Sequence, residues 1–305
     1  MVRAVVVGVA GAVALGALGV AAVVGLADGR TDAASDGEPL DCPDLDAPAG
    51  SDAGPLVVPP SAGTPAAYTI EVVDRLPHDE SAFTQGLIHA GGLLYEGTGE
   101  YGGSRIRLLS PPDGAVLVEQ ALPDAMFGEG IAAHDGRLYQ LTWREQTVLV
   151  RDRCSLSETS RLTYQGEGWG LTGDGDVLWR SDGTGTLTAH DPSTFAVVRT
   201  VDVQDRGQPV TRLNELELVA GQILANVWQT PWIARIDPSS GQVTAWIDAS
   251  PLVDEVGATD PDEVLNGIAV DPASGRLWLT GKRWPTVFEV DVVAGQSAPR
   301  PGEFG

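Results

Sequence analysis

An internal repeat limits what this chain can fold into more than any other feature of its sequence. Five segments share one shape, and each is followed by a turn and then a short apolar strand. The equivalent residues are Gln85, Glu129, Trp169, Asn214 and Asn266. Successive positions lie 44, 40, 45 and 52 residues apart. Such a spacing is typical of a repeated supersecondary unit.

Each repeat continues with a turn and a second apolar strand, as in His134-Asp135-Gly136 followed by Arg137-Leu138-Tyr139. Turns rich in Gly and Asp connect the strands of β-hairpins, and further strands end in Asp-Pro turns such as Asp191-Pro192. About four strands per repeat predict an all-β, five-bladed β-propeller over residues 68–294. A β-sandwich, the main rival, does not repeat a whole four-stranded unit. No long helical period interrupts the pattern.

Two rings of residues should surround the axis of such a propeller. The repeated residues form the first ring, at the starts of the innermost strands. The same alignment puts a second ring at the end of the next strand, formed by Gly99, Trp143, Gly183, Trp228 and Lys282. Lys282 is the only lysine of the chain. The rings predict an axial pocket with three indoles, one carboxylate, one ammonium and several amides, a composition typical of binding sites.

Each ring residue also has an ordinary structural explanation. Tryptophans in propellers usually pack between blades, a glutamate after glycine is usually solvated, and amides at strand starts often satisfy backbone groups. Their coincidence on one inferred axis favours a functional pocket. There, a carboxylate beside a lysine suits proton transfer to and from a nitrogen nucleophile, and the amides suit a carboxamide substrate.

Charge and residue spacing argue against several ligand classes. The formal net charge is −23, from 42 acidic and 19 basic residues, and the sequence has no basic stripe for a nucleic-acid partner. The four histidines lie mostly in turns, and no cluster has the spacing of zinc ligands. A calcium-dependent propeller would need several axial carboxylates. We therefore predict no metal and no cofactor.

The ends of the chain read as targeting and connecting segments. The 23 residues from Ala4 to Leu26 are uncharged, follow Arg3, and are long enough to span a bilayer. We expect residues 1–27 to be a signal peptide or an N-terminal membrane anchor. Residues 28–67 should be a disordered linker, and residues 295–305 a disordered tail. The folded part would then lie outside the cytoplasm, secreted or anchored to the membrane.

The two cysteines, Cys42 and Cys154, are too far apart in sequence for a CxxC metal or redox motif. Oxidising compartments favour disulfides. We therefore expect a Cys42–Cys154 bond that ties the linker to the body, with two free thiols as the alternative. We expect the protein to be a monomer.

A set of motifs, taken in order, resembles the plant and bacterial glutaminyl cyclotransferases. The resemblance covers most of the body, from about residue 68 to residue 290. The segments that carry it are Phe83-Thr84-Gln85-Gly86-Leu87, Phe127-Gly128-Glu129-Gly130, Leu141-Thr142-Trp143, Glu167-Gly168-Trp169-Gly170-Leu171-Thr172, Leu213-Asn214-Glu215-Leu216-Glu217, Ala225-Asn226-Val227-Trp228 and Thr280-Gly281-Lys282-Arg283-Trp284-Pro285.

This resemblance implies a five-bladed propeller without a catalytic metal that acts on peptides or proteins with an N-terminal glutamine. In that family the α-amine attacks its own γ-carboxamide, ammonia leaves and pyroglutamate remains. The positions that line the family's active site correspond here to Phe83, Gln85, Glu129, Trp143, Trp169, Asn214, Trp228 and Lys282. All but Phe83 belong to the two rings.

We expect three residues to be catalytic. Glu129 would relay a proton from the attacking amine to the leaving ammonia, and Lys282 and Asn214 would steady the carboxamide oxygen as charge develops on it. The other pocket residues would bind the substrate and orient its folded-back side chain. These are Phe83, Gln85, Trp143, Trp169, Trp228 and Asn266.

Two other functions fit part of the pattern. A non-catalytic propeller at the cell envelope would bind a peptide or a glycan, and would need the pocket but not the pairing of Glu129 with Lys282. A metal-dependent hydrolase or lactonase would lose its activity when a chelator removes the metal.

Overall fold

β-Strands make up most of the computed structural model, which describes residues 42–45, 64–296, 298–299 and 302–304. The expected targeting segment, residues 1–27, lies outside the described residues, as does most of the expected linker. Within the described ranges, no helix is long and apolar enough to cross a membrane. The helix α1 spans Ser250–Val256.

Four-stranded antiparallel sheets follow one another along the first part of the described chain. Tight turns join their strands, and residues with positive φ occupy these turns, for example Asp135 and Gly136 between β6 and β7. The strands of these sheets are β2 (Thr84–Ala90), β3 (Leu93–Thr98), β4 (Arg105–Ser110) and β5 (Ala115–Ala121); β6 (Gly128–His134), β7 (Arg137–Thr142), β8 (Thr147–Asp152) and β9 (Glu158–Thr163); and β10 (Leu171–Gly173), β11 (Leu178–Arg180), β12 (Thr186–His190) and β13 (Val197–Asp202).

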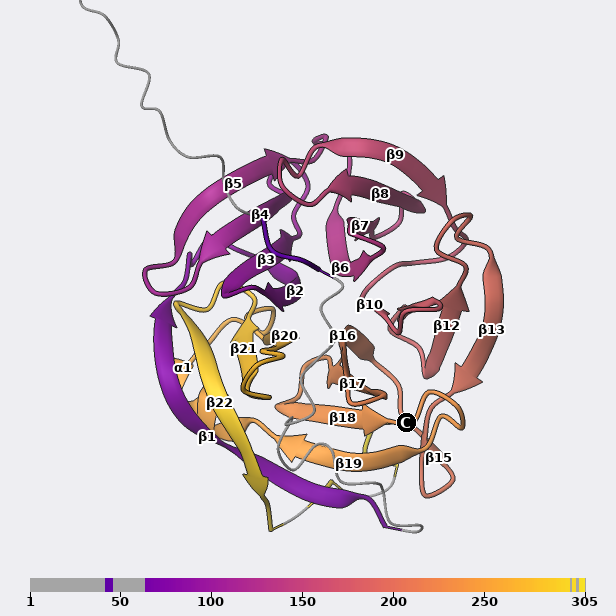
Figure 1. Cartoon of the computed structure of the whole chain (residues 1–305). Coiled ribbons are helices and arrows are strands. Elements are labelled where there is room, and N and C mark those ends of the chain that lie inside the picture. The colour runs from indigo at the N-terminus through magenta and orange to yellow at the C-terminus, as the bar shows by residue number, and fades with distance from the viewer. Residues whose placement is uncertain (1–41, 46–63, 297, 300–301, 305) are drawn as a thin grey trace, which may run out of the picture. The chain divides into compact units, whose positions relative to one another are not determined.

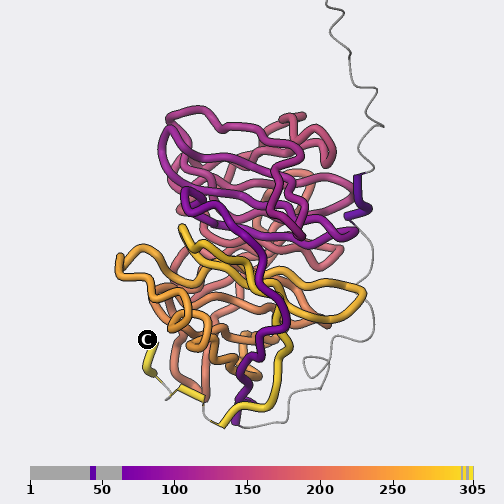
Figure 2. The backbone as a smooth tube through the Cα atoms, turned by 90° about the vertical axis from the view of Figure 1, so that its left-hand side faces the viewer, coloured from indigo at the N-terminus to yellow at the C-terminus, as the bar shows by residue number. Residues whose placement is uncertain are grey.

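An eight-stranded sheet follows, in the order β16-β17-β18-β19-β1-β22-β21-β20. The N-terminal strand β1 lies in its middle, parallel to β19 and antiparallel to β22. Figure 2 shows β1 and β22 side by side, so the two ends of the folded chain are joined. Strand β1 begins at Ala66, two residues before the start expected for the body. The remaining strands are β1 (Ala66–Pro77), β16 (Leu213–Val219), β17 (Gln222–Val227), β18 (Trp232–Ile236), β19 (Val243–Asp248), β20 (Leu265–Val270), β21 (Leu277–Gly281) and β22 (Thr286–Ala294), with β14 (Gln204–Asp205) and β15 (Gln208–Pro209) as a separate pair.

The sheets stand around a common centre, as Figure 1 shows. The innermost strands neighbour one another in the order β2, β6, β10, β16, β20 and back to β2. Burial falls outward from this centre, because β7 and β8 are mostly buried whereas β5, β9 and β13 are mostly exposed. This gradient explains why the inner strands read as short apolar runs.

Apolar side chains fill the space between neighbouring sheets. Tyr95 and Ile106 of the first sheet pack with Ile131 and Leu138 of the second. Similar clusters join the second sheet to the third, the third to β16–β19, β16–β19 to β20–β22, and β20–β22 to the first sheet. The described core is therefore a closed series of sheet-to-sheet contacts around the centre.

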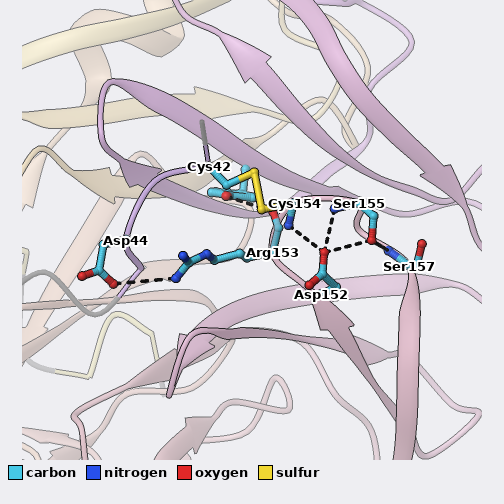
Figure 3. The surroundings of a disulfide bond; sticks show 8 residues. Cys42, Asp44, Asp152, Arg153, Cys154, Ser155 and Ser157 are labelled. Carbon is cyan, nitrogen blue, oxygen red and sulfur yellow. Dashed lines mark hydrogen bonds and ion pairs between the residues drawn. A yellow bond between two sulfur atoms is a disulfide. The ribbon is translucent and has the colours of Figure 1, made fainter. Parts of the chain in front are cut away.

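Cys42 and Cys154 form a disulfide across 112 residues of sequence, as expected (Figure 3). The turn that carries Cys154 is held by Asp152, whose Oδ1 accepts the backbone N–H of Cys154 at 3.1 Å and of Ser155 at 2.8 Å. Asp44 adds an ion pair with the arginine that precedes Cys154. Because disulfides persist in oxidising compartments, the bond indicates a location outside the cytoplasm.

Part of the expected C-terminal tail packs against the body. Phe304 is buried, and its ring lies 5.3 Å from that of Trp246, measured between centroids. The carbonyl oxygen of Phe304 accepts hydrogen bonds from the backbone N–H of Thr211 at 2.9 Å and from Thr211 Oγ1 at 2.6 Å. A lone phenylalanine in a polar segment is the sequence signal for this docking.

Candidate active site

Bulges at the starts of the innermost strands shape the first ring. Gln85, Glu129, Asn214 and Asn266 are each the second residue of their strand. The register against the next strand shifts across each of them. A β-bulge re-aims the side chains beside it and is common next to active sites. Trp169 lies two residues before the short strand β10.

Backbone hydrogen bonds bring the second ring to the same end of each sheet. Trp143, Trp228 and Lys282 come directly after β7, β17 and β21. Each donates its backbone N–H to the carbonyl of the residue two positions before a first-ring residue, at 2.9, 2.8 and 2.9 Å. The hairpin of a repeat therefore places its two ring residues next to each other.

These residues line a cavity of about 320 Å³. Its walls contain Phe83, Gln85, Glu100, Phe127, Glu129, Trp143, Trp169, Asn214, Trp228, Asp262 and Lys282. The cavity thus brings together the site residues expected from the sequence, with one exception. Asn266 lies behind the wall, where its Nδ2 donates to Thr84 O at 2.9 Å and to Gln85 Oε1 at 3.1 Å. It orients Gln85 and does not face the cavity.

Glu129 and Lys282 bring opposite charges into the buried part of this cavity, where they are 4% and 5% exposed. Burial raises the pKa of Glu129 well above its usual value, with Lys282 opposing this rise and Glu167 adding to it. Burial lowers the pKa of Lys282 to about 8, and the carboxylates of Glu129, Asp262 and Glu100 limit that fall. The raised pKa makes the Glu129 carboxylate a stronger base, and the lowered pKa makes the Lys282 ammonium a stronger acid.

Aromatic rings occupy the space that glycine leaves in the second ring. A Cβ atom added at Gly99 would collide with the Phe127 ring, and one added at Gly183 would lie 2.7 Å from the Trp169 ring. Glycine at these positions makes room for two aromatic walls of the cavity. Trp169 also meets Trp228 edge to face, with 5.6 Å between ring centroids.

The structure adds cavity residues that the two-ring alignment does not predict. Phe127 lies two positions before a first-ring residue, as Phe83 does in the preceding repeat. Glu167 holds the equivalent position in the next repeat; it does not line the cavity, but it accepts hydrogen bonds from the wall residues Trp143 and Trp169. A third ring, two positions before the first, would have identified Phe83, Phe127 and Glu167. Glu100 lines the cavity directly after the second-ring residue Gly99, whereas Asp262 lines it from the loop before β20, outside the aligned segments.

Part of the cavity wall has unused hydrogen-bonding capacity. Asn214 Oδ1 is buried and has no hydrogen-bond partner. Such atoms are rare in folded proteins, and at a cavity wall they offer a partner to a bound polar group. Among the residues that the structure describes, no group of three or more His, Cys, Asp or Glu side chains is placed to hold a metal ion.

Both the sequence and the fold match known proteins. The family model described as glutamine cyclotransferase matches residues 52–292. A glutaminyl-peptide cyclotransferase from Arabidopsis thaliana is 40% identical over 240 residues, which cover 77% of this chain and 74% of that protein. The crystal structure of a glutaminyl cyclase from Myxococcus xanthus matches with a TM-score of 0.73 and 41% identity, over 76% of this chain and 100% of that chain. On this evidence, the chain belongs to the glutamine cyclotransferase family.

Proposed function

We propose that this protein converts the N-terminal glutamine of peptides and proteins to pyroglutamate and releases ammonia. One observation carries the proposal. A buried carboxylate with a raised pKa and a buried ammonium with a lowered pKa, those of Glu129 and Lys282, share one cavity with aromatic walls. The Arabidopsis relative, a glutaminyl-peptide cyclotransferase, and the Myxococcus relative, a glutaminyl cyclase, support the same activity.

In the proposed reaction, the α-nitrogen of the glutamine forms a bond to its own side-chain carbonyl carbon, and the carbonyl π electrons move to oxygen. The tetrahedral intermediate then collapses, and the bond from this carbon to the amide nitrogen breaks. The attacking nitrogen must lose a proton, and the leaving nitrogen must gain one to depart as ammonia. A single group that accepts a proton and then returns it balances both steps.

Glu129 is the group that relays this proton. Lys282 and Asn214 stabilise the carboxamide oxygen while it carries negative charge. The ammonium of Lys282 lies over the ring of Phe83, with 4.6 Å from Nζ to the centroid, a contact that helps to hold the charge at the cavity wall. Gln85, oriented by the amide behind it, positions the polar groups of the substrate.

The aromatic walls orient the substrate. An extended glutamine side chain keeps its carboxamide away from the α-amine, so ring closure requires the chain to fold back on itself. Phe83, Trp143, Trp169 and Trp228 would enclose the folded side chain, which lowers the entropic cost of reaching the reactive geometry. The same rings exclude water from the developing charge.

We also propose that the fold is a five-bladed β-propeller and that the reaction needs no metal. In this interpretation the eight-stranded sheet counts as two blades, β16–β19 and β20–β22 with β1, joined by the parallel β1–β19 pair. The hydrophobic clusters support the count, because each of those described lies between two neighbouring blades. The proton relay and the charge stabilisation are both assigned to side chains.

The location of the protein leads to two smaller proposals. Residues 1–27 would direct export, either as a removed signal or as a retained membrane anchor, and the exported protein would be a monomer. Mass spectrometry of the N-terminal peptide from the exported protein distinguishes removal from retention. Light scattering of the purified protein measures the oligomeric state.

The activity is tested by ammonia release from a glutaminyl dipeptide, with and without EDTA. We expect release that EDTA does not affect, and no release from the same peptide with an acetylated α-amine, because acetylation removes the nucleophile. Glu129→Gln should abolish most of the release. A folded protein that binds glutaminyl peptides without releasing ammonia would contradict the proposal and favour a peptide-binding function. EDTA-sensitive release would contradict only the metal-free mechanism.

A further inference from the structure

Glu167, in the loop before β10, contacts two tryptophan walls of the cavity. Its Oε2 accepts the indole N–H of Trp143 at 2.8 Å and that of Trp169 at 3.1 Å. Trp143 follows β7 in one four-stranded sheet, whereas Trp169 precedes β10 in the next. One carboxylate oxygen therefore joins two walls that belong to different sheets.

Arg144 completes this arrangement on the outer side. Its Nε donates to Glu167 Oε1 at 3.1 Å, and its guanidinium carbon lies 3.6 Å from the centroid of the Trp143 ring. Phe127 contacts the same indole, with 5.5 Å between ring centroids. Because each indole has a single N–H donor, its hydrogen bond to a fixed oxygen sets the rotation of the ring plane.

We propose that Glu167 is a positioning residue for glutamine cyclisation, which holds the Trp143 and Trp169 rings in the orientation that folds the substrate side chain back on its α-amine. The inference rests on the proposed cyclotransferase activity. It assigns no proton transfer to Glu167. Cyclisation requires the α-nitrogen and the carbonyl carbon to approach within about 3–3.5 Å, and a misplacement of about 1 Å is costly. Rotation of either tryptophan ring would allow the α-nitrogen and the carbonyl carbon to move apart.

The exposure of Glu167 separates this role from a purely structural one. Its side chain is 38% exposed and that of Arg144 is 60% exposed. Exposed ion pairs contribute little to global stability. Loss of the Glu167 carboxylate should therefore lower kcat/KM clearly while it changes the free energy of unfolding little.

The charge of Glu167 gives a second signature. It raises the pKa of Glu129, although less than burial does. A neutral residue at position 167 should therefore lower the pKa of Glu129 and move the acid limb of the kcat profile to lower pH. A residue that acts only through packing would leave this limb where it is.

Two substitutions separate hydrogen bonding from charge. Glu167→Ala removes the acceptor, and we expect kcat/KM for a glutaminyl dipeptide to fall roughly 10- to 100-fold, mostly through kcat. Glu167→Gln keeps an acceptor oxygen and should recover most of that loss. Both variants should show the shifted acid limb. The matched control is Glu119→Ala, because Glu119 forms an ion pair with Arg105 at 2.8 Å and is 33% exposed, but lies on the outer strand β5. The control should match the unsubstituted protein in kcat/KM and in the position of the acid limb.

The indole N–H signals give a readout that does not depend on activity. In protein labelled with ¹⁵N-tryptophan, the Trp143 and Trp169 signals are assigned by Trp143→Phe and Trp169→Phe. Hydrogen bonds to a carboxylate move such signals downfield, so both should move upfield in Glu167→Ala and stay in place in Glu119→Ala.

Three results would overturn the proposal: unchanged kcat/KM in folded Glu167→Ala, equal losses in the alanine and glutamine variants, or indole signals that do not move. If the unsubstituted protein releases no ammonia, the proposed function fails, whereas the indole signals still decide whether Glu167 holds both rings. If Glu167→Ala does not fold, Glu167→Leu, which removes the acceptor but keeps most of the side-chain volume, is combined with Trp143→Phe. Non-additive losses in kcat/KM would then support the shared contact, and additive losses would overturn it.

Discussion

The ammonium of Lys282 should lose its proton near pH 8, and the activity should fall with it. Burial lowers the pKa of this group from 10.5 to about 8. With a pKa of about 8, only about 1% of Lys282 keeps its proton at pH 10, where an ordinary lysine is still mostly charged. In the proposed mechanism the ammonium stabilises negative charge on the carboxamide oxygen, so kcat/KM should fall about tenfold for each pH unit above 8. The acid limb of kcat/KM should reflect both the α-amine of the free substrate, whose pKa is about 7.7–8.0, and the carboxyl of Glu129, which must lose its proton before it can act as a base.

Two substitutions test whether the charge of Lys282 determines the alkaline limb of kcat/KM. Lys282→Arg keeps a positive charge throughout the accessible pH range, so the alkaline limb should disappear even if altered geometry lowers the maximum. Asp262→Asn removes a carboxylate that supports the charged form of Lys282. The alkaline limb should therefore move to lower pH in this variant.

The pKa can also be measured without turnover. Since Lys282 is the only lysine of the chain, reductive ¹³C-methylation gives one lysine signal besides that of the N-terminal amine. Its NMR titration should have a midpoint near pH 8 in the folded protein and near the ordinary lysine value in urea. A folded-state midpoint above pH 10 would refute the reasoning. An alkaline limb that is unchanged in Lys282→Arg would assign the limb to another group.

Glu129→Gln should keep the fold and lower kcat at least about 100-fold, measured as ammonia release; near-normal turnover would exclude the relay. Lys282→Met should abolish ammonia release yet raise the Tm at pH 7. Below its folded-state pKa, the buried ammonium lowers the free energy of unfolding by up to about 3 kcal/mol. A lower Tm in this variant would contradict that cost. Gly183→Ala should lower kcat/KM at least about tenfold, because the new Cβ displaces Trp169 and φ is +79°; unchanged kcat/KM would show that the wall tolerates the shift. Cys154→Ser should lower the free energy of unfolding, measured in urea, by about 2–4 kcal/mol. It should leave kcat/KM at room temperature unchanged, because the disulfide does not touch the cavity. Equal free energies of unfolding in the variant and the unsubstituted protein would show that the bond does not stabilise the fold.

The repeat predicts most of the cavity because a hairpin links strand order to side-chain position. Once one hairpin places Glu129 and Trp143 at the same end of a sheet, every hairpin of the same length places its equivalents there. The chemistry then follows from the residue types at those positions. The alignment does not identify residues outside the repeated segments, such as the loop residue Asp262.

Contacts that depend on closure of the ring could not be predicted in this way. Nothing in the local pattern of residues 66–77 indicates that β1 fills the gap between β19 and β22, since strand pairing is set by partners far away in the sequence. Asn266 is equivalent to Gln85 in the repeat, but closure brings β20 beside β2, and the Asn266 amide binds Gln85 instead of facing the cavity. Docking of Phe304 likewise depends on a surface that only the folded sheets create.

The burial that makes Glu129 and Lys282 costly also explains how they suit the reaction. In water the pKa values of a glutamate and a lysine differ by about six units, so neither group matches an amine of pKa about 8 well. In the cavity the pKa of Glu129 rises and that of Lys282 falls to about 8, which brings both toward the α-amine of the substrate. Each shift reduces the difference in basicity between the side chain and the α-amine, and a smaller difference favours general acid–base catalysis. Substitutions that stabilise the cavity by removing either charge should therefore cost activity, because the desolvation that opposes folding is the same desolvation that matches these pKa values.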